Sequence, residues 1–394
     1  MSRNVPKLRF KGFEDEWKEK KMALLGTFLK GNGISKSDLS ESGKECILYG
    51  ELYTTYGEVI ESIKSKTDIS LKNEVLSKIN DVIIPSSGES AIDIATASCV
   101  MKDNILLGGD LNVFRPNKDN GVFISYQLNN SKKKDIAKIA QGASVVHIYN
   151  EQLKQLKVNI PSLEEQEKIA NFLSKVDSII EKQEKKVQYW NSYKKGMMQK
   201  IFSQKIRFKD DNGRDYPEWK EKKLGEICII VMGQSPSSAS YNDDNIGVPL
   251  VQGNADIYNK ITKPRLYTSE ITKICNENDI IMSVRAPVGS IAIADRNCCI
   301  GRGVCAIKSK ENQSFLYQFL LDKEDKWGKI SQGSTFESIN SNDIKRLKIM
   351  IPNIKEQEKI AEFLLNIDSL VEKETKELEE LRILKKGLLQ QIFI

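Results

Sequence analysis

The chain has 394 residues, which is long enough for two or three domains with a core each. It carries 60 Lys and Arg residues against 54 Asp and Glu residues, so its net charge of +6 permits a polyanionic partner without requiring one. Its seven cysteines contain no CxxC pair, which indicates reduced thiols, several of them in the core, rather than a metal site. No run of residues approaches the ~18 apolar residues of a membrane span, so we expect a cytoplasmic protein without a membrane partner.

The first segment of the chain returns later in the sequence. Residues 1–26 contain LRFKGFEDEWKEKKMALLG, and residues 206–227 read IRFKDDNGRDYPEWKEKKLGEI. The second copy directly follows a long helical segment, whereas the first copy opens the chain and a matching helical segment ends it. This circularly permuted order predicts that the two termini lie close together. It also predicts equivalent capping roles for Arg9-Phe10 and Arg207-Phe208.

Two stretches, roughly 27–160 and 228–351, have the pattern of mixed α/β domains with irregular loops. Strand-like runs occur at 46–54, 80–87 and 143–149 in the first stretch, and at 227–233, 247–253, 279–284 and 289–295 in the second. A helix-like run occupies 315–327. The interiors of the two stretches match only in outline, with Gly33-Ile-Ser-Lys aligned to Gly233-Gln-Ser-Pro. Their last residues, 140–161 and 331–352, match well.

The longest repeat spans Pro161 to Phe202 and returns at Pro352 to Phe393 with a constant offset of 191 residues. Apolar residues recur every three or four positions in both copies, and charged residues fill the other positions, as in a coiled-coil seam. A helix of this length spans about 60 Å at ~1.5 Å per residue. Neither copy can bury its seam alone, so we expect the two helices to pack against each other in antiparallel fashion.

Polar residues interrupt the apolar seam at Gln183 and at the equivalent Glu374. We interpret them as a device that penalises slipped register, although tolerated polarity in a long helix is the alternative. Gly196 and Gly387 lie inside the helical segments, at a cost of about 0.5–1 kcal/mol relative to alanine. They either mark fraying or admit the close approach of a globular domain or a partner, and we favour the second interpretation.

The sequence offers no pattern typical of catalysis. It contains one histidine, His147, and none of the GxSxG, Walker-loop or HExxH motifs. The glycine pairs Gly31/Gly33 and Gly301/Gly303 are too closely spaced for a dinucleotide or S-adenosylmethionine cradle and predict turns. Recognition is therefore the favoured class of function, and an enzyme with a cryptic site ranks last.

Two related domains around a pseudo-two-fold axis could place one domain on each half of a DNA site, because duplex DNA has the same kind of axis. Arg, Gln and Asn side chains can contact base edges bidentately, whereas Lys, Ser and Tyr mostly contact phosphates. The loop residues that we predict to contact DNA are Lys30, Ser35, Lys36, Tyr49, Ser86, Ser87, Glu89, Arg115, Gln234, Ser235, Tyr241, Gln252, Asn254, Arg265, Arg285 and Arg302. Among them, Arg285 is the strongest candidate, because a Pro-Gly loop follows a strand-like run there.

Several of these motifs together resemble one family. Each long helix opens with P-x-x-x-E-Q-x-x-I-A, at Pro161 and at Pro352, and closes with K-K-G, two Leu or Met residues, Q-x-I-F, ending at Phe202 and Phe393. The loop motifs that agree are Gly33-Ile-Ser-Lys, Tyr49-Gly-Glu-Leu-Tyr, Ile84-Pro-Ser-Ser-Gly-Glu, Gly109-Asp-Leu-Asn, Gly233-Gln-Ser-Pro and Arg285-Ala-Pro-Val-Gly-Ser. With these motifs, the chain resembles the specificity subunit of type I restriction-modification enzymes over nearly its whole length.

The resemblance implies an α+β fold with two mixed α/β target-recognition domains in a pseudo-two-fold arrangement, joined by a long antiparallel two-helix coiled coil. The implied domains are a first recognition domain at 1–160, a central spacer helix at 161–204, a second recognition domain at 205–351, and a C-terminal spacer helix at 352–394.

The implied function is non-catalytic. The chain would read a bipartite site in double-stranded DNA and hold two methyltransferase subunits together with motor-nuclease subunits. S-adenosylmethionine, ATP and Mg would bind to these partners and not to this chain. The assembled complex would be an adenine methyltransferase and ATP-dependent endonuclease. The alternative is a free-standing bipartite DNA-binding or scaffold protein without methyltransferase partners.

Overall fold

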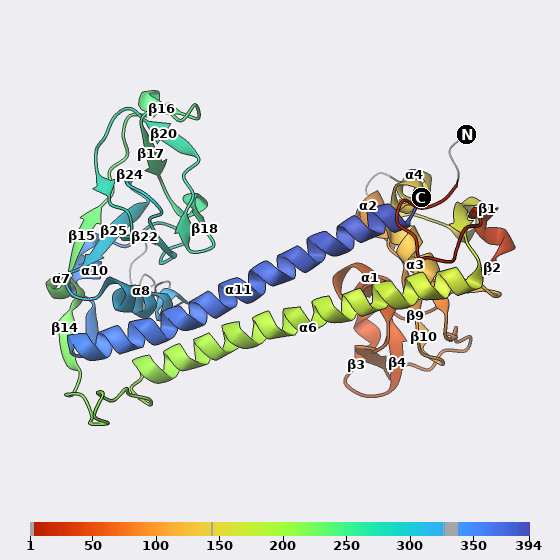
Figure 1. Cartoon of the computed structure of the whole chain (residues 1–394), viewed down its shortest axis with the longest axis horizontal. Helices are drawn as coiled ribbons and strands as arrows, with labels where there is room; N and C mark the ends of the chain where they lie inside the picture. The colour runs from red at the N-terminus through yellow and green to blue at the C-terminus, as the bar shows by residue number, and fades with distance from the viewer. Residues whose placement is uncertain (1–3, 143–144, 326, 328–337) are drawn as a thin grey trace. The chain divides into compact units, whose positions relative to one another are not determined.

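The computed structural model describes residues 4–142, 145–325, 327 and 338–394. The chain divides into two compact units, each described here by itself (Figure 1). Unit 1 comprises Met1–Glu184 and Lys376–Ile394, and unit 2 comprises Lys185–Thr375. Each unit contains a sheet-rich domain and parts of two long helices, α6 (Leu163–Phe202) and α11 (Ile354–Ile392). The predicted α+β fold class is confirmed.

The domain of unit 1 is built on a five-stranded sheet in the order β2-β11-β7-β9-β5 and a four-stranded sheet in the order β10-β4-β6-β3. The central strand β7 (Asp81–Pro85) is buried along its whole length, because Val82 and Ile84 pack into one hydrophobic core and Ile83, on the opposite face, packs into another. The strands are β1 (Lys18–Lys21), β2 (Gly26–Lys30), β3 (Leu39–Ser40), β4 (Lys44–Ile47), β5 (Val59–Ile60), β6 (Ser65–Thr67), β7 (Asp81–Pro85), β8 (Ser87–Gly88), β9 (Ser98–Val100), β10 (Leu106–Leu107), β11 (Leu111–Pro116), β12 (Val146–His147) and β13 (Lys157–Ile160). The helices are α1 (Glu51–Thr54), α2 (Ala91–Ile94), α3 (Gly121–Asn129), α4 (Lys133–Ile139) and α5 (Asn150–Gln155).

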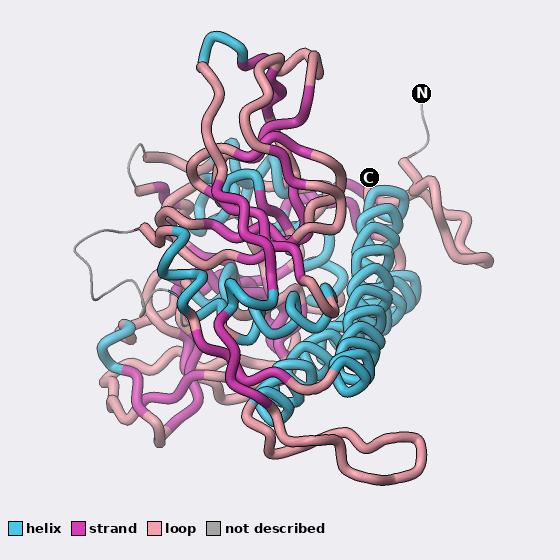
Figure 2. The backbone as a smooth tube through the Cα atoms, turned by 90° about the vertical axis from the view of Figure 1, so that its left-hand side faces the viewer, coloured by secondary structure: helices cyan, strands magenta, loops and turns pink. Residues whose placement is uncertain are grey.

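The domain of unit 2 has a six-stranded sheet in the order β15-β25-β22-β23-β19-β18 and a five-stranded sheet in the order β16-β20-β17-β24-β21. Figure 2 views the molecule from the side of this unit and shows the strands in magenta. The strands are β14 (Lys220–Lys223), β15 (Cys228–Met232), β16 (Tyr241–Asn242), β17 (Val248–Val251), β18 (Ile257–Tyr258), β19 (Ile261–Thr262), β20 (Leu266–Thr268), β21 (Ile274–Cys275), β22 (Ile280–Ser283), β23 (Ile291–Ile293), β24 (Cys298–Ile300), β25 (Val304–Ser309) and β26 (Lys348–Ile351). The helices are α7 (Leu224–Ile227), α8 (Gln313–Asp322) and α10 (Ser341–Arg346), and two 3-10 turns occupy Ser238–Ser240 and Asn254–Asp256.

The two long helices run antiparallel within each unit. In unit 1, the Nζ atom of Lys385 lies 2.6 Å from a carboxylate oxygen of Asp177, and Arg382 pairs with Glu184 at 2.6 Å. The contact positions therefore descend along α11 as they ascend along α6, and apolar residues near the two helix ends share the core of the unit.

Unit 2 repeats this antiparallel pairing at its own end of each helix. Lys186 of α6 pairs with Glu374 of α11 at 2.8 Å, and Lys194 pairs with Asp368. Lys194 and Asp368 are the repeat equivalents of Lys385 and Asp177. Equivalent lysine and aspartate residues therefore join the helices in both units. The lysine lies on α11 in unit 1 and on α6 in unit 2.

An arginine connects the first segment of the chain to α6 in unit 1. The Nε and Nη2 atoms of Arg9 both lie 2.8 Å from the carboxylate oxygens of Glu165, which is buried at the start of the helix. This hydrogen-bonded carboxylate raises the pKa of Arg9. The ring of Phe10 packs edge-on against Phe172, with 5.6 Å between ring centroids.

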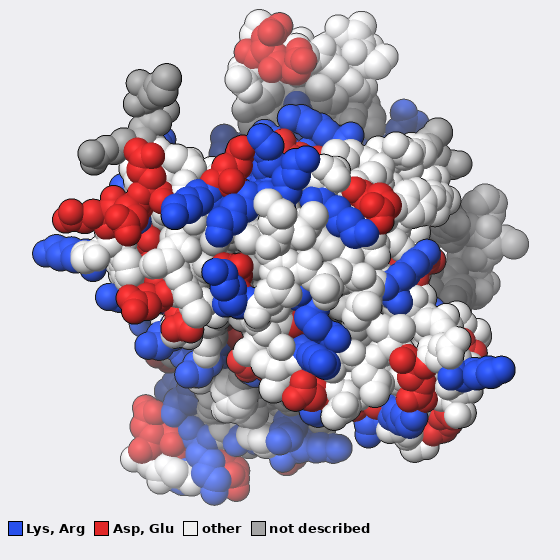
Figure 3. All heavy atoms as spheres, turned by 90° about the vertical axis from the view of Figure 1, so that its right-hand side faces the viewer, with Lys and Arg blue, Asp and Glu red and all other residues white. Residues whose placement is uncertain are grey.

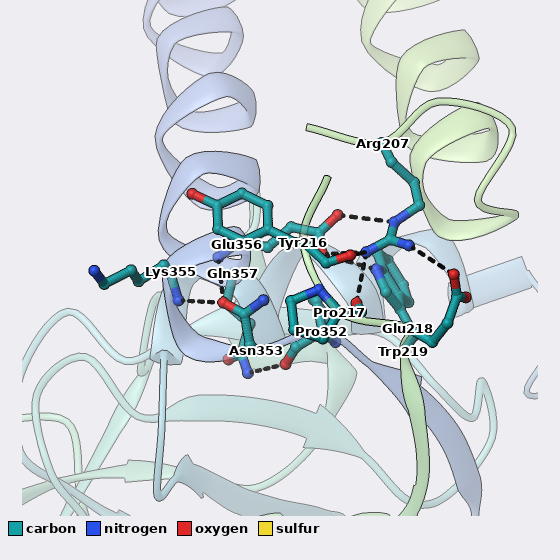
Figure 4. A network of polar contacts seen from close by, with 10 residues as sticks. All are labelled: Arg207, Tyr216, Pro217, Glu218, Trp219, Pro352, Asn353, Lys355, Glu356 and Gln357. Atoms are coloured by element: carbon teal, nitrogen blue, oxygen red, sulfur yellow. Dashed lines mark hydrogen bonds and ion pairs between the residues drawn. The ribbon is translucent and has the colours of Figure 1, made fainter. Parts of the chain in front are cut away.

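Unit 2 contains the equivalent connection to α11 (Figure 4). Arg207 donates to the buried carboxylate of Glu356 at 3.2 and 2.9 Å, and Phe208 packs against Phe363 at 5.5 Å. The Nε1 atom of Trp219 also donates to Glu356, at 3.1 Å. The predicted equivalence of Arg9-Phe10 and Arg207-Phe208 is confirmed.

The glutamines of the repeated Glu-Gln pair are buried and fix the domain to the start of each helix. In unit 1, the Nε2 atom of Gln166 donates to Asp119 Oδ1 at 2.9 Å and to the carbonyl of Pro161 at 3.1 Å. In unit 2, Gln357 donates to Glu311 at 2.6 Å and to the carbonyl of Pro352 at 2.9 Å. The motif that opens each helix therefore has an internal, structural role.

The start and the end of the chain meet in unit 1, as the permuted repeat predicts. The backbone N–H of Leu8 donates to the carbonyl of Gln391 at 3.0 Å, and the side chain of Asn159 donates to the carbonyl of Ile394 at 3.0 Å. The ring of Trp17 lies edge-on to that of Phe393.

Two predictions need correction. The run 46–54 is not one strand, because β4 ends at Ile47 and α1 begins at Glu51. The carboxylate of Glu51 accepts a hydrogen bond from the backbone N–H of Leu48 at 2.7 Å and so stabilises the turn between them. A Cβ atom added at Gly196 or Gly387 would meet no described atom within 4 Å, so neither glycine admits close approach of the described part of this chain, whereas close approach of a partner there stays a prediction.

Other expectations have mixed outcomes. All seven cysteines are buried free thiols, as predicted. Gln183 and Glu374 are both buried, and their role in setting the register stays a prediction. Part of the run 143–149 and part of the run 315–327 lie outside the described residues. No helix in the described ranges has the length and apolar character that a membrane crossing requires.

Candidate nucleic-acid interface

The two domains share a set of backbone hydrogen bonds that the sequences do not reveal. Five bonds in unit 1 recur in unit 2 between equivalent residues, all with N···O distances of 2.7 to 3.0 Å. The pairs are Gly31 N to Leu111 O and Gly233 N to Val304 O; Asn32 N to Leu107 O and Gln234 N to Ile300 O; Gly108 N to Ile47 O and Gly301 N to Val251 O; Ser86 N to Asp110 O and Val284 N to Gly303 O; and Ile148 N to Ser86 O and Ile339 N to Val284 O. We call these ten bonds the shared frame.

The shared frame corrects the alignment of the first loop. Gly31 corresponds to Gly233, because each donates to the first residue of β11 or β25, and each is too close to a facing backbone carbonyl for a Cβ atom. The sequence alignment had instead paired Gly33 with Gly233. The sequence does not reveal this two-residue shift in the alignment, because each glycine is required by its contacts with residues that lie far along the chain.

A polar hollow of about 600 Å³ lies at the loops of unit 2. It brings together six of the eight residues predicted to contact DNA in this half of the chain, namely Ser235, Tyr241, Gln252, Asn254, Arg285 and Arg302. They come from five places: the loop after β15, the start of β16, the loop after β17, the loop after β22 and the turn between β24 and β25. The remaining two, Gln234 and Arg265, are exposed and do not line the hollow.

The two arginines of the hollow differ from most others in the chain. Both are exposed, and neither forms an ion pair with any described carboxylate. The arginines that do pair with carboxylates are Arg9, Arg115, Arg207, Arg214, Arg265, Arg296 and Arg382. Within the described part of the chain, Arg346 on α10 is the other arginine without such a partner. The positive charges at the hollow are therefore available to a ligand.

A buried carboxylate that the sequence analysis missed holds one wall of the hollow. Asp256 accepts a hydrogen bond from the backbone N–H of Gln252 at 2.8 Å and another from Nε of Arg265 at 3.0 Å. It thereby closes the turn that presents Asn254. The sequence signal is an aspartate five residues after the end of an apolar strand, in a turn where such residues are common.

The predicted contact residues of unit 1 have a different setting. Arg115 forms an ion pair with the fully buried carboxylate of Asp81 through two hydrogen bonds of 2.7 Å, and this pairing raises the pKa of the arginine. Ser86 and Ser87 are buried, and Ser87 pairs with His147 in a short strand pair. Thus three of the eight positions are occupied by internal contacts.

The other positions of unit 1 are more accessible. Lys30, Lys36 and Glu89 are exposed, and Ser35 is bound to Asp38 at 2.6 Å. Tyr49 is half-buried beside Tyr53. On the face of unit 1 in Figure 3, Lys and Arg side chains are interspersed with Asp and Glu side chains.

Comparison with known proteins identifies the family. The model of the type I restriction modification DNA specificity domain matches the chain twice, at residues 14–188 and 216–382. The chain belongs to this family. This chain therefore contains two recognition domains in a single polypeptide, and each domain contains the shared frame.

Two curated relatives come from Methanocaldococcus jannaschii. The putative type I restriction enzyme MjaX specificity subunit is 38% identical over 299 residues, covering 72% of this chain and 70% of the relative. The type I restriction enzyme MjaVIII specificity subunit is 26% identical over 366 residues, covering 86% and 84%.

Two solved structures have the same fold. The type I restriction-modification S subunit from M. genitalium has a TM-score of 0.65 at 17% identity, over 99% of each chain. A chain from a study of complex assembly and conformational transition in a type I R-M system has a TM-score of 0.59 at 23% identity, over 97% of this chain and 98% of that chain. The prediction of the family from the repeated motifs is confirmed.

Proposed function

We propose that this specificity subunit reads a bipartite site in double-stranded DNA, with one recognition domain on each half. The observation that carries this proposal is the polar hollow of unit 2, where two arginines that form no ion pair with a described carboxylate meet amide and hydroxyl side chains. Donors and acceptors of this kind match the edges of base pairs in the major groove. The second copy of the family domain supports a second half-site.

We further propose that the chain performs no chemistry itself and holds two methyltransferase subunits together with motor-nuclease subunits. S-adenosylmethionine, ATP and Mg would then bind to these partners, and the assembly would methylate adenine and cleave DNA with ATP. The helix repeat supports two copies of one partner, because equivalent positions of α6 and α11 recur at the same offset. The names of the relatives as specificity subunits agree with a recognition role.

The test is to co-express the chain with the methyltransferase subunit of its own system and sequence the methylated positions of the host DNA. We expect one two-part motif with a spacer of fixed length, and native mass spectrometry should give two methyltransferase subunits per chain. A host that lacks only this chain is the control and should show no such motif. A single contiguous motif, or a methylation pattern that does not depend on this chain, would contradict the proposal.

A further inference from the structure

We propose that Arg285 and Arg302 each read a guanine in the half-site bound by unit 2, and that unit 1 reads its half-site without an arginine at either equivalent position. This inference rests on the proposed function and deepens it, since it assigns base identity to one half of the DNA site.

The backbone places the two arginines next to each other. The N–H of Val284 donates to the carbonyl of Gly303 at 2.9 Å, and Ser283 pairs with Val304 in the antiparallel ladder of β22 and β25. Arg285 follows Val284 and Arg302 precedes Gly303, so the two arginines continue in the same direction from neighbouring strands. Neighbouring strands lie about 4.8 Å apart, and like charges on adjacent strands are destabilising. An acceptor-rich ligand that receives both side chains removes this repulsion.

The side chain of Arg302 is held at its base. The Oγ atom of Ser235 lies 3.2 Å from the backbone N of Arg302 and 3.3 Å from its Nε. This contact uses the inner nitrogen of the guanidinium group and leaves both terminal nitrogens for a ligand. Two parallel N–H donors match the O6 and N7 acceptors of guanine in the major groove.

The composition of the hollow favours base edges over phosphates. The chain contains 49 lysines and 11 arginines, yet among the described residues no lysine lines the hollow, and both of its cations are arginines. Lysine is a compact point charge that suits phosphate, whereas the planar fork of arginine suits paired acceptors. Gln252 and Asn254 line the same hollow, and amide side chains are the usual partners of adenine.

The shared frame identifies the matching positions in unit 1. Ser87 follows Ser86 as Arg285 follows Val284, and Gly109 follows Gly108 as Arg302 follows Gly301. A serine and a glycine therefore replace the two arginines. By the same correspondence, Leu48 replaces Gln252 and Gly50 replaces Asn254. None of these four residues can make a bidentate contact with a base, so the two half-sites are read by different chemistry.

The first experiment maps the methylated motif of the complete system with Arg285→Ala, Arg302→Ala and the control Arg346→Ala. The control removes an exposed arginine of the same unit that forms no ion pair with a described carboxylate and does not line the hollow. Each hollow variant should accept other bases at one guanine position, with roughly 10- to 100-fold less discrimination there. The two positions should differ but lie in the same half-site, and the control should keep the full motif.

The second experiment uses the unaltered complex, so it does not depend on the folding of a variant. Replacing each of the two guanines by 7-deazaguanine removes the N7 acceptor and should weaken binding, whereas the same replacement in the other half-site serves as the control. An additional check combines this base replacement with the variants of the first experiment: in the matching arginine variant, the 7-deazaguanine substitution should have no further effect.

The outcomes separate this inference from the proposed function. Uniformly weaker binding in the variants, with an unchanged motif and a salt dependence lowered by about one phosphate contact, would overturn guanine reading but leave DNA binding at the hollow intact. An unchanged motif and unchanged affinity in both variants would show that the hollow does not contact DNA, and would overturn both. A half-site of unit 2 without guanine would overturn this inference alone.

Discussion

Replacing Arg9 by alanine should destabilise unit 1 more than replacing Arg207 destabilises unit 2, although the two arginines are repeat equivalents. The carboxylates that they bind, Glu165 and Glu356, are 1% and 0% exposed. Glu356 has a further donor in the indole of Trp219, whereas no second side chain among the described residues donates to Glu165. The removal of Arg9 therefore leaves a buried carboxylate with no side-chain partner.

The size of the difference follows from the hydrogen bonds. Removing one member of a buried ion pair costs about 3–5 kcal/mol, because the remaining charge stays buried and uncompensated. A hydrogen bond to a charged group contributes about 1.5–3 kcal/mol, and this contribution of Trp219 survives in the Arg207 variant. We therefore expect Arg9→Ala to exceed Arg207→Ala by about 1.5 kcal/mol or more, a factor of roughly ten in the local opening constant.

Hydrogen exchange followed by mass spectrometry is the suitable assay, because a chain of two units need not unfold in one step. Peptides at the start of α6 report on the Arg9 variant, and peptides at the start of α11 report on the Arg207 variant. A double variant, Arg9→Met with Glu165→Met, removes both charges and should recover much of the lost protection. Equal losses in the two single variants, or a double variant as unstable as Arg9→Ala, would refute this reasoning.

Three further predictions concern the helices and the recognition domains. Burial raises the pKa of Asp177, and Lys385 opposes that rise. A carboxyl with a raised folded-state pKa loses its contribution to stability as the pH rises through the folded value. Lys385→Met, which also leaves Glu58 beside Asp177, should therefore lower the free energy of unfolding more near neutral pH than near pH ~4 in urea titrations. Replacing residues 228–351 with the matching segment of a relative should change one half-site only, as genome-wide methylation sequencing would show; a change in both would contradict one domain per half-site. Inserting four residues beside Gln183 adds about 6 Å of helix, roughly one turn, and should lengthen the spacer by about one or two base pairs, whereas two residues should abolish binding because they turn the domain away. An unchanged spacer in a folded four-residue variant would show that the helices do not set it.

The helical repeats and the arginine connections could be predicted from the sequence because they rest on local periodicity and on duplication. The apolar residues of α6 recur along the same helix, and Arg9 was assigned a role through its second copy, Arg207. Duplication also predicted the meeting of the two termini, which the hydrogen bond between Leu8 and Gln391 confirms.

Other features depend on partners that are distant in the sequence, and these could not be read from it. Arg115 has the pattern of an exposed loop arginine, but Asp81, 34 residues earlier, binds it in the folded domain. The composition around Leu48 predicts a strand, because the flanking residues are typical of strands. In the structure the backbone turns there, because the carboxylate of Glu51 accepts a hydrogen bond from the backbone N–H of Leu48. The gathering of Arg285, Arg302 and Gln252 at one hollow follows from strand order, which single loops do not encode.

The shared frame explains how a specificity subunit can change its target while keeping its fold. A Cβ atom at Gly31 or Gly233 would overlap with the facing carbonyl of Gly108 or Gly301, so the frame itself restricts these positions in both units. By contrast, Arg302 lies between two frame residues, and its side chain is exposed. The frame hydrogen bonds are formed by the backbone of Gly301 and Gly303 and do not involve the guanidinium group of Arg302. Substitution at such positions would change the side chains that we propose to contact DNA and would leave the backbone hydrogen bonds intact. The two units of this chain already show that exchange, since the same five backbone bonds recur in both units while the neighbouring side chains differ.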